Sequence, residues 1–225
     1  MKGIRHTEKR FEVQTAQEIY TASAIIVATG TVPKKLNIPG EGELRGRGIS
    51  YCATCDGPLF KDRDIAVIGC GNSGLQEGYF LLKFVKSITF IEFLPYMTGE
   101  KILQERLKNE TKAKFFLNHI LTCIHGKERV ESITVRNRTN NEEKTIEVGG
   151  VFIYVGYTAL SGFLKDVIKL DNNGFIVTDE NLQTSVPGIF AAGDIRSKRI
   201  RQIVTACAEG AEAAIHAHYY IDSLQ

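Results

Sequence analysis

The sequence predicts an α/β fold built around parallel strands, and three observations lead to this prediction. Two continuous apolar runs, residues 24–28 and 65–68, are each closed by a glycine-containing turn, as strands buried on both faces are. The second run leads into a glycine-rich loop and an amphipathic stretch over residues 75–85. A further strand over residues 88–91 completes a strand, loop, helix and strand within the length of one βαβ unit.

Length, composition and charge describe an ordinary globular chain. Its 225 residues are 43% hydrophobic and 24% charged, which is enough to bury a core in one large or two modest domains. The 28 Lys and Arg residues nearly balance the 26 Asp and Glu residues, so no broad surface for nucleic acid is expected. No apolar stretch has the length of a membrane span, so we expect a cytoplasmic protein without a membrane partner.

Other segments extend the predicted architecture. Residues 34–48 contain one proline and four glycines among charged residues, which favours an irregular connection between domains. Residues 114–155 contain several short β-prone runs and predict a hairpin or a three-stranded meander. Beyond them, residues 175–178 and 189–192 predict strands, and the alanine-rich residues 202–221 predict a long helix.

The loop after residue 68 carries a dinucleotide-binding pattern. Gly69, Gly71 and Gly74 have the spacing Gly-x-Gly-x-x-Gly between the predicted strand and helix. The first glycine permits a tight turn, the second lets backbone N–H groups approach a pyrophosphate, and the third lets helix and strand pack closely. Asn72 or Ser73 can cap the helix, whose N-terminus presents partial positive charge to phosphates. We therefore expect a nucleotide site, against the alternative of a glycine-rich turn without a ligand.

Glu92 ends the next predicted strand, about 20 residues beyond the loop. A carboxylate at that position accepts hydrogen bonds from a ribose 2′-hydroxyl and repels a 2′-phosphate. Residues 93–95, Phe-Leu-Pro, include no arginine that would offset a phosphate dianion. The sequence therefore predicts a preference for NADH over NADPH.

Cys52 and Cys55 are the only closely spaced pair among five cysteines. The Cys-x-x-Cys spacing allows a disulfide with little backbone distortion, and such motifs generally contain a reactive thiol. A structural zinc site needs four ligands, and no second cysteine pair is present, so we expect a redox pair and no metal. Asp56, next to the pair, could move the proton. We interpret the other cysteines as packing or core residues: Cys70, Cys123 and Cys207.

Several segments together resemble a known family. They are residues 38–41 (Ile-Pro-Gly-Glu), residues 48–57 with the cysteine pair, the glycine loop, residues 188–194 (Gly-Ile-Phe-Ala-Ala-Gly-Asp) and residues 201–203 (Arg-Gln-Ile). In this order, over essentially the whole chain, they are similar to low-molecular-weight thioredoxin reductases, which are pyridine nucleotide-disulfide oxidoreductases. Residues 88–104, where Glu92-Phe93 stands in place of the family's His-Arg-Arg, are more similar to the flavoprotein subunit of alkyl hydroperoxide reductase and to atypical thioredoxin reductases that do not favour NADPH.

The resemblance implies a three-layer Rossmann-like fold with two domains, one for FAD and one for NAD(P). Residues 1–49 would be a remnant of the FAD domain and a linker, residues 50–156 the NAD(P)-binding domain, and residues 157–225 the C-terminal part of the FAD domain. Electrons would pass from NAD(P)H through FAD to the Cys52–Cys55 disulfide and then to thioredoxin or a similar disulfide protein. The family also implies a homodimer.

The resemblance further implies roles for single residues. Cys55 would face the flavin, Cys52 would exchange with the partner's sulfur, and Asp56 would be the general acid and base. Asp194 matches an aspartate that contacts the ribityl chain of FAD, and residues 201–203 match a segment that covers the isoalloxazine. The residues expected to bind cofactors are Thr29, Gly30, Gly69, Gly71, Asn72, Ser73, Gly74, Glu92, Gly156, Gly193, Asp194, Arg201, Gln202 and Ile203.

One departure from the family concerns the FAD half. No Gly-x-Gly-x-x-Gly precedes residues 28–30 (Ala-Thr-Gly), so we expect at least one βαβ unit, about 30 residues, to be missing from that half. The chain would then bind FAD weakly, because the helix N-terminus that holds the pyrophosphate belongs to the missing unit. Two alternatives remain at this point: a non-catalytic NAD-binding module or fragment, and the reductase component of a peroxiredoxin system.

Overall fold

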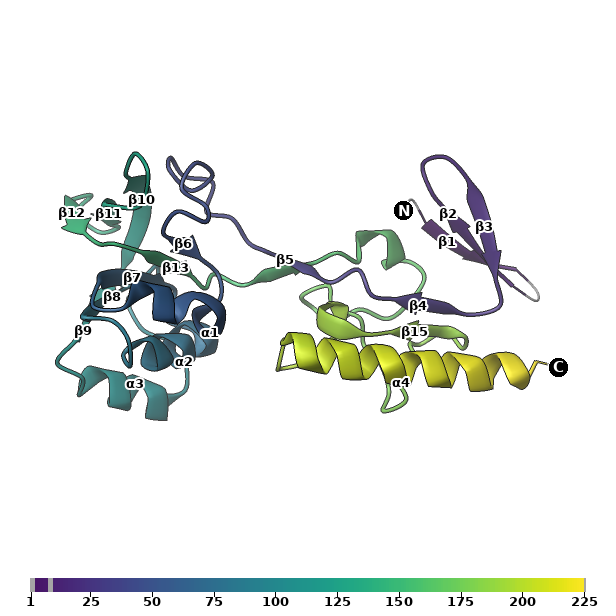
Figure 1. The fold of residues 1–225 in the computed structure, drawn as a ribbon. Coiled ribbons are helices and arrows are strands. Elements are labelled where there is room, and N and C mark those ends of the chain that lie inside the picture. Colours follow the sequence, from purple (N-terminus) through teal and green to yellow (C-terminus); the bar gives the residue numbers. More distant parts are fainter. Residues whose placement is uncertain (1–2, 8–9, 225) are drawn as a thin grey trace. The chain divides into compact units, whose positions relative to one another are not determined.

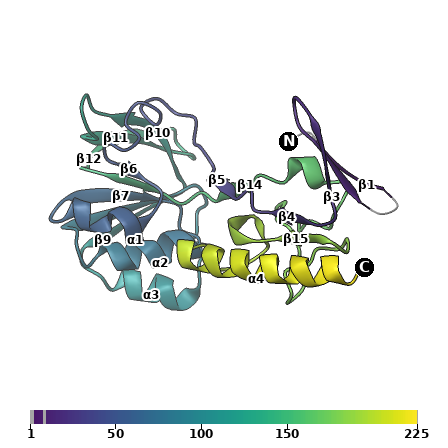
Figure 2. The ribbon, with the colours of Figure 1, turned by 45° about the vertical axis from the view of Figure 1, so that its right-hand side comes forward.

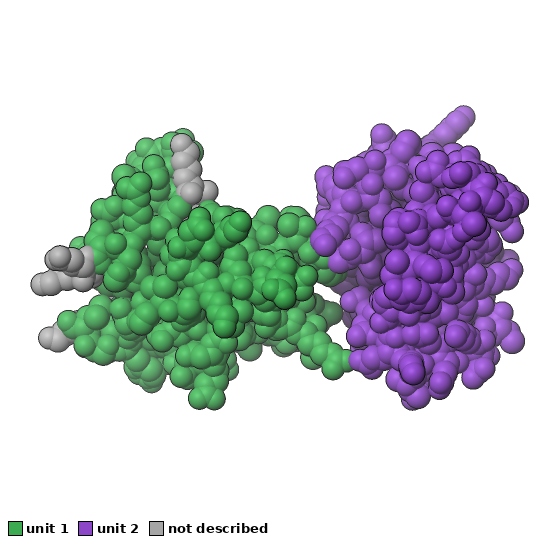
Figure 3. All heavy atoms as spheres, turned by 180° about the vertical axis from the view of Figure 1, so that it is seen from behind, with its two compact units in different colours: residues 1–32, 157–225 green, residues 33–156 purple. Residues whose placement is uncertain are grey.

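The computed structural model describes residues 3–7 and 10–224, and the chain forms two compact units (Figures 1 and 3). Unit 1 comprises residues 1–32 and 157–225, and unit 2 comprises residues 33–156, so unit 2 is inserted into the sequence of unit 1. The chain crosses between the units twice, through β5 (Thr31–Pro33) and β14 (Tyr157–Ala159), and these two strands pair. The backbone N–H of Lys34 also donates to the carbonyl of Gly156 (2.9 Å).

A five-stranded parallel sheet forms the middle layer of unit 2, in the order β6–β13–β7–β8–β9. The strands are β6 (Ile49–Ser50), β7 (Asp64–Ile68), β8 (Ser87–Glu92), β9 (Ala113–Leu117) and β13 (Val151–Ile153). The strands predicted over residues 65–68 and 88–91 are confirmed as β7 and β8. Both are buried on both faces because a layer covers each side of the sheet (Figure 2).

Alternating side chains of β7 fill two separate cores. Ile65 and Val67 pack with residues of the helical layer, which consists of α1 (Ala53–Asp56), η1 (Gly57–Phe60), α2 (Asn72–Leu81) and α3 (Lys101–Lys108). Ala66 and Ile68 pack on the opposite side, against a second sheet. This alternation follows from the period of two along a strand, and it makes unit 2 a three-layer structure.

The second sheet of unit 2 is an antiparallel meander of β10 (His119–His125), β11 (Ser132–Asn137) and β12 (Glu143–Glu147). The prediction of a meander within residues 114–155 is therefore confirmed. Two of the β-prone runs in that region form β9 and β13 of the parallel sheet instead. Short apolar runs look alike in sequence whether they enter a parallel or an antiparallel sheet, so the pattern alone could not separate them.

Unit 1 is built around a parallel pair, β4 (Ile25–Val27) and β15 (Ile189–Ala191). Beside them stand an antiparallel sheet of β1 (Gly3–His6), β2 (Phe11–Gln14) and β3 (Ile19–Ala22), two short turns, η2 (Gly162–Leu164) and η3 (Gly193–Ile195), and the long helix α4 (Ile203–Asp222). Phe190 lies under α4 with Ala213 and Ala217, whose small side chains allow close packing. The predicted long helix is confirmed.

Two expectations for unit 1 are wrong. The strand at residues 24–28 is not buried on both faces, because Ile26 is 40% exposed and β4 pairs only with β15 among the described residues. Residues 175–178 do not form a strand; Ile176 makes isolated bridges with Leu170 and Arg196 instead. Within the described part of the chain, no helix combines the length and hydropathy needed to cross a lipid bilayer.

We expect Gly78→Ala to destabilise the protein, although alanine is the better helix former. A Cβ at Gly78 would lie 2.5 Å from the ring of Phe90, which is fully buried and stacked on Phe115. Overpacking costs about 1–3 kcal/mol, and helix propensity returns at most about 1 kcal/mol. Gly210→Ala in α4, where a Cβ meets nothing within 4 Å, is the matched control and should raise stability. Urea unfolding measures both, and equal shifts in the two variants would contradict the prediction.

Candidate active site

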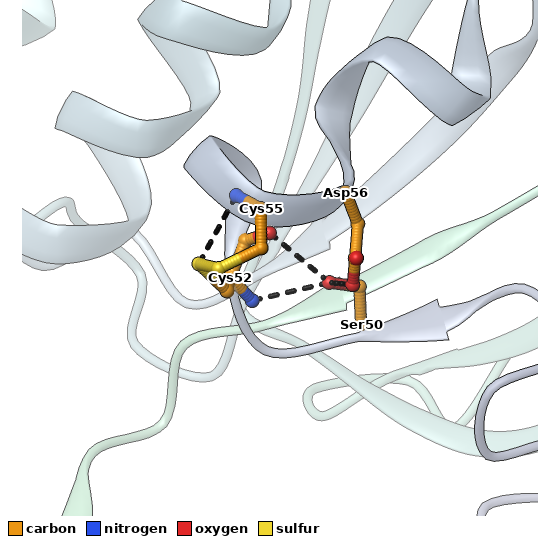
Figure 4. The surroundings of a disulfide bond; sticks show 4 residues. All are labelled: Ser50, Cys52, Cys55 and Asp56. Carbon is orange, nitrogen blue, oxygen red and sulfur yellow. Dashed lines mark hydrogen bonds between the residues drawn. A yellow bond between two sulfur atoms is a disulfide. The ribbon is translucent and has the colours of Figure 1, made fainter. Parts of the chain in front are cut away.

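Cys52 and Cys55 form a disulfide directly after β6, with their Cα atoms 5.3 Å apart (Figure 4). Cys52 is the N-cap of α1, and its sulfur lies 3.2 Å from the backbone N–H of Cys55. Cys55 is exposed, whereas Cys52 is half-buried. The pair is therefore held by one tight turn at the carboxyl end of a parallel strand, and one of its sulfurs belongs to an exposed residue.

A serine connects Asp56 to the cysteine pair, as Figure 4 shows. The hydroxyl of Ser50 donates to Asp56 Oδ2 (2.7 Å) and accepts the backbone N–H of Cys52 (3.1 Å). Ser50 is 3% exposed, so the serine end of this link is shielded from water, whereas Asp56 is half-buried. Sequence reasoning placed Asp56 near the disulfide but missed Ser50, because the bond joins residues on either side of a turn.

Glu77 is a second carboxyl group near the disulfide, and no sequence pattern pointed to it. It lies on α2, which packs against α1, and it accepts a hydrogen bond from the backbone N–H of Thr54 inside the Cys-x-x-Cys turn. Burial raises the pKa of Glu77, and the bond from Thr54 offsets part of this increase. Helical periodicity could have indicated which face of α2 it occupies, but not that α1 lies there.

The segment before the cysteines is anchored by Glu41, which is 4% exposed. Its carboxylate accepts the backbone N–H groups of Leu36 (3.1 Å) and Asn37 (2.7 Å) and the hydroxyl of Tyr51 (3.1 Å). Burial and the charge of Glu41 raise the pKa of Tyr51 to about 12. Residues 36–41 are thereby fixed to the residue immediately before Cys52.

The three glycines of the loop after β7 meet different constraints. Gly69 has φ +103°, and a Cβ there would lie 2.5 Å from the carbonyl of Tyr154. A Cβ at Gly74 would lie 1.9 Å from the carbonyl of Gly69. At Gly71 the closest atom would be Thr98 Oγ1 at 3.6 Å, so the chain itself does not crowd this position. The loop thus has the approach space that a nucleotide pyrophosphate requires.

The predicted cap of α2 is wrong. Gly71 is the N-cap, and it makes no side-chain capping bond. The side chain of Asn72 binds elsewhere, because its Oδ1 accepts the backbone N–H of Glu100 (2.7 Å) and so ties the loop to the segment before α3. Because no side chain caps α2, its first N–H groups remain available to an anion.

Glu92 lies at the end of β8 and is 7% exposed. Its two oxygens accept the backbone N–H groups of Cys70 (2.6 Å) and Leu94 (3.0 Å). Cys70 is fully buried, and burial, with a smaller effect of Glu92, raises the pKa of its thiol to about 12, as suits a packing residue. The carboxylate therefore connects the glycine loop to the end of the neighbouring strand.

Arg138 reaches the same edge from the turn between β11 and β12. Its guanidinium lies 3.6 Å from the ring centroid of Phe93, and Nη1 donates to the Phe93 carbonyl (3.0 Å). Its backbone N–H donates to the carbonyl of Asn118 (2.9 Å), which holds the turn in place. Sequence reasoning looked for a cation only within residues 93–95 and missed this one, which lies 45 residues away along the chain.

In unit 1, the expected FAD residues follow the carboxyl ends of the parallel strands β4 and β15. Thr29 Oγ1 donates to the carbonyl of Leu160 (3.0 Å), and the backbone N–H of Leu160 donates to the carbonyl of Gly30. The N–H of Gly193 donates to Glu209 Oε2 (2.7 Å). Asp194 Oδ1 is buried, accepts no hydrogen bond from the described residues and lies 4.0 Å from Lys198 Nζ. An acceptor left in this state fits a ligand hydroxyl.

Residues 201–203 continue from this group into α4. Arg201 Nε donates to the carbonyl of Asp194 (3.3 Å), and its guanidinium lies over the ring of Phe175. Gln202 is the N-cap of α4 and forms a capping box with Thr205. Ile203 is 82% exposed and presents an apolar surface at the start of the helix.

The expected residues thus form two groups, one in each unit. In unit 2 the cysteine pair, the glycine loop, Glu92 and Gly156 follow the ends of β6, β7, β8 and β13, which lie at one edge of the parallel sheet. In unit 1 the segments of Thr29 and of Asp194 follow the ends of β4 and β15. Ligands of open parallel sheets bind outside the carboxyl ends of the strands, which is where both groups lie.

Comparisons with known proteins agree with this arrangement. Residues 1–210 match the family described as pyridine nucleotide-disulphide oxidoreductase. Thioredoxin reductase from Peptoclostridium litorale is 41% identical over 98% of this chain and 72% of its own length. The bifunctional thioredoxin reductase/thioredoxin of Mycobacterium leprae is 41% identical over 93% of this chain and 46% of its own length. The crystal structure of thioredoxin reductase from Streptococcus pyogenes superposes with a TM-score of 0.88, at 37% identity, over 99% of this chain and 73% of that one.

The family match spans nearly the whole chain. The chain also aligns with more than two-thirds of the length of relatives that are 41% identical to it. A disulfide in the Cys-x-x-Cys turn and a Rossmann-like sheet carrying a glycine loop accompany the match. The chain therefore belongs to the pyridine nucleotide-disulphide oxidoreductase family and is an oxidoreductase of the thioredoxin-reductase type.

Proposed function

We propose that this chain transfers electrons from NADH, by way of FAD, to the Cys52–Cys55 disulfide and then to a disulfide of a thioredoxin-like protein. The observation that carries the proposal is the disulfide itself, which follows β6 at the same sheet edge as the glycine loop. A nucleotide-binding module without catalysis has no use for such a pair beside a Ser50–Asp56 link. The geometry therefore favours an enzyme.

The loop after β7 and the start of α2 would hold the pyrophosphate of the nicotinamide dinucleotide. Gly71 leaves room for it, and the uncapped N–H groups of Asn72, Ser73 and Gly74 face the N-terminal end of the helix. Glu92 keeps the loop in place through the N–H of Cys70. Gly156, with φ +98°, ends the segment after β13 at the same edge.

Unit 1 would contribute the residues that bind FAD, which supplies two-electron transfer between nicotinamide and disulfide when bound. Asp194 offers a buried acceptor for a ribityl hydroxyl, and Gly30 and Gly193, both with positive φ, keep the strand ends free of side chains. The side chain of Arg201 is held beside Asp194 by its hydrogen bond to the Asp194 carbonyl. With Gln202 and Ile203, it would lie near the isoalloxazine ring system of FAD. The weak FAD binding expected from the sequence stays a prediction.

We assign the thiol steps from the resemblance to thioredoxin reductases. Once the disulfide is reduced, Cys52 would attack a sulfur of the partner's disulfide and form a mixed disulfide, and Cys55 would resolve it by attacking Cys52. The partner's leaving thiolate needs a proton, and Asp56 is the closest carboxyl group along the chain, linked through Ser50 to the backbone of Cys52. We assign Asp56 the role of general acid and base.

The partner is proposed to be a thioredoxin-like protein, since the relative from Mycobacterium leprae is named as a bifunctional thioredoxin reductase/thioredoxin. We also propose a homodimer, supported by apolar side chains that α4 exposes, among them Val204 (70%) and Tyr219 (64%). A peroxiredoxin system is the second candidate, because residues 88–104 resemble the alkyl hydroperoxide reductase subunit. Reduction of each disulfide protein by the purified chain distinguishes the two.

One prediction of the proposed function concerns the electron path. With FAD added anaerobically, the parent chain should consume one equivalent of NADH more than the Cys52→Ser/Cys55→Ser variant, because only the parent has a reducible disulfide. Absorbance of the flavin and of NADH follows the titration, and gel filtration measures how much FAD is retained. Equal consumption by both chains would overturn the proposed path, and a chain that binds NADH without oxidising it would be a binding module.

The role assigned to Asp56 predicts a loss of turnover in Asp56→Asn. General acid–base catalysis contributes typically 10²–10⁴-fold, so reduction of the partner should slow by about a hundredfold while flavin reduction by NADH stays unchanged. Ser50→Ala, which removes the bridging hydroxyl but keeps the carboxyl group, should have a smaller effect. Stopped-flow absorbance separates the two half-reactions. Unchanged partner reduction in Asp56→Asn would refute the role.

The nucleotide preference predicts that NADH has a kcat/KM at least about tenfold above that of NADPH. Phe93→Arg should lower the ratio of kcat/KM for NADH to kcat/KM for NADPH by about tenfold. The reason is that it places a second guanidinium beside Arg138, where a 2′-phosphate would lie. Phe93→Gln controls for loss of the ring. Glu92 is left intact, since it anchors Cys70 and Leu94. Equal use of the two nucleotides by the parent, with loss of NADPH use in Arg138→Gln, would show that Arg138 already binds the phosphate.

A further inference from the structure

A second thiol site lies away from the Cys52–Cys55 disulfide, on the meander of unit 2. Cys123 was interpreted as a core residue, and this is wrong: it is half-buried, and its sulfur lies 3.6 Å from Nδ1 of His125, which is exposed. Nε2 of the same ring lies 2.7 Å from Thr134 Oγ1 on the neighbouring strand. A thiol, an imidazole and a hydroxyl are thus in line across β10 and β11.

An irregularity of β10 brings this group together. Leu121 pairs with Val135 and Cys123 pairs with Thr134, so Thr122 is an extra residue and the strand contains a β-bulge. Without the bulge, residue 123 would lie on the same face as the buried Leu121, because side chains alternate along a strand. The bulge instead turns Ile124 into the core and leaves Cys123 and His125 on the outer face.

The hydroxyl chain beyond the ring allows Nε2 of His125 to carry the proton. Thr134 Oγ1 lies 3.5 Å from Thr145 Oγ1 on β12, so Thr134 can donate its own proton there and accept one from Nε2 of His125. In that tautomer Nδ1 has its lone pair toward the sulfur of Cys123 and can take the thiol proton. The competing acceptor is the carbonyl of Ile124, at 3.8 Å from the sulfur.

We propose that Cys123, His125 and Thr134 form a reactive thiol site that exchanges with small disulfides and so becomes modified as a mixed disulfide. A nucleophile beside a base that a third group orients is the arrangement of activated nucleophiles generally. This site is independent of the electron path proposed above, because it requires neither nucleotide nor flavin. Cys207, on α4, is more exposed than Cys123, and its sulfur makes no hydrogen bond with the described residues, so it offers an internal comparison.

The exchange balances without a further reagent. The Cys123 proton passes to Nδ1 of His125, and the thiolate attacks one sulfur of the small disulfide. The disulfide bond of the reagent breaks as the new bond to Cys123 forms, and the departing thiolate takes the proton from the imidazolium. One disulfide replaces another, so nothing is oxidised or reduced overall.

The test uses the full chain with its Cys52–Cys55 disulfide intact and the neutral probe 4,4′-dithiodipyridine, whose released thiopyridone is followed by absorbance. The Cys207→Ser variant gives the reaction rate of Cys123, and the Cys123→Ser variant gives that of Cys207. Peptide mass mapping locates the modified residue. At pH 7 we expect Cys123 to react about tenfold faster than Cys207, in spite of its lower exposure. In urea, where both thiols lose their surroundings, peptide mass mapping should show Cys123 and Cys207 modified at equal rates, separately from Cys70, which urea also exposes.

Variants of His125 and Thr134 complete the test. In the Cys207→Ser background, His125→Gln should slow the reaction by about tenfold and Thr134→Val by a smaller factor. His119→Gln, on the same strand but bonded to the carbonyl of Leu117, is the matched control and should leave the rate unchanged. The proposal is overturned if Cys123 reacts no faster than Cys207, or if His125→Gln leaves its rate unchanged while the circular dichroism spectrum remains that of the parent.

Discussion

The carboxylate of Glu92 joins the ends of two neighbouring parallel strands, and the shape of the sheet edge that carries the glycine loop depends on it. The group is nearly inaccessible to water, so its charge must be balanced by the N–H groups of Cys70 and Leu94. This bond fixes the first turn of the glycine loop after β7 relative to the end of β8. The position of α2, and with it that of Glu77 beside the cysteine turn, follows from the same fixed loop.

The cysteine pair lies in a short turn whose surroundings are held by polar groups rather than by packing alone. Glu41 binds two N–H groups upstream and the hydroxyl of Tyr51, and Ser50 binds both the backbone of Cys52 and the carboxylate of Asp56. Each of these buried groups would cost free energy without its partner, so they define one geometry for the turn. A sulfur that reacts with two different partners in succession, as we propose for Cys52, benefits from a turn that does not have to be reordered each time.

The sequence was sufficient for elements that are local and strongly patterned. The unit from β7 through the glycine loop and α2 to β8 could be predicted because all of its signals are contiguous, and Cys52, Cys55 and Asp56 stand out by spacing alone. What it could not show depends on contacts between distant segments. Arg138 meets Phe93 through a turn of another sheet, and Cys123 faces outward because of one bulge in β10. The cap of α2 was misjudged because Asn72 binds the backbone of a residue that is remote in sequence.

The insertion of unit 2 between β4 and β15 has a consequence for the order of folding during synthesis. All strands of the five-stranded sheet and the meander lie in one continuous stretch, so unit 2 can complete its structure while the last third of the chain is still on the ribosome. The pairing of β4 with β15 must wait until that stretch has emerged. By then the folded insert has brought its own two ends together through Lys34 and Gly156, which shortens the effective loop and reduces the entropy cost of closing unit 1.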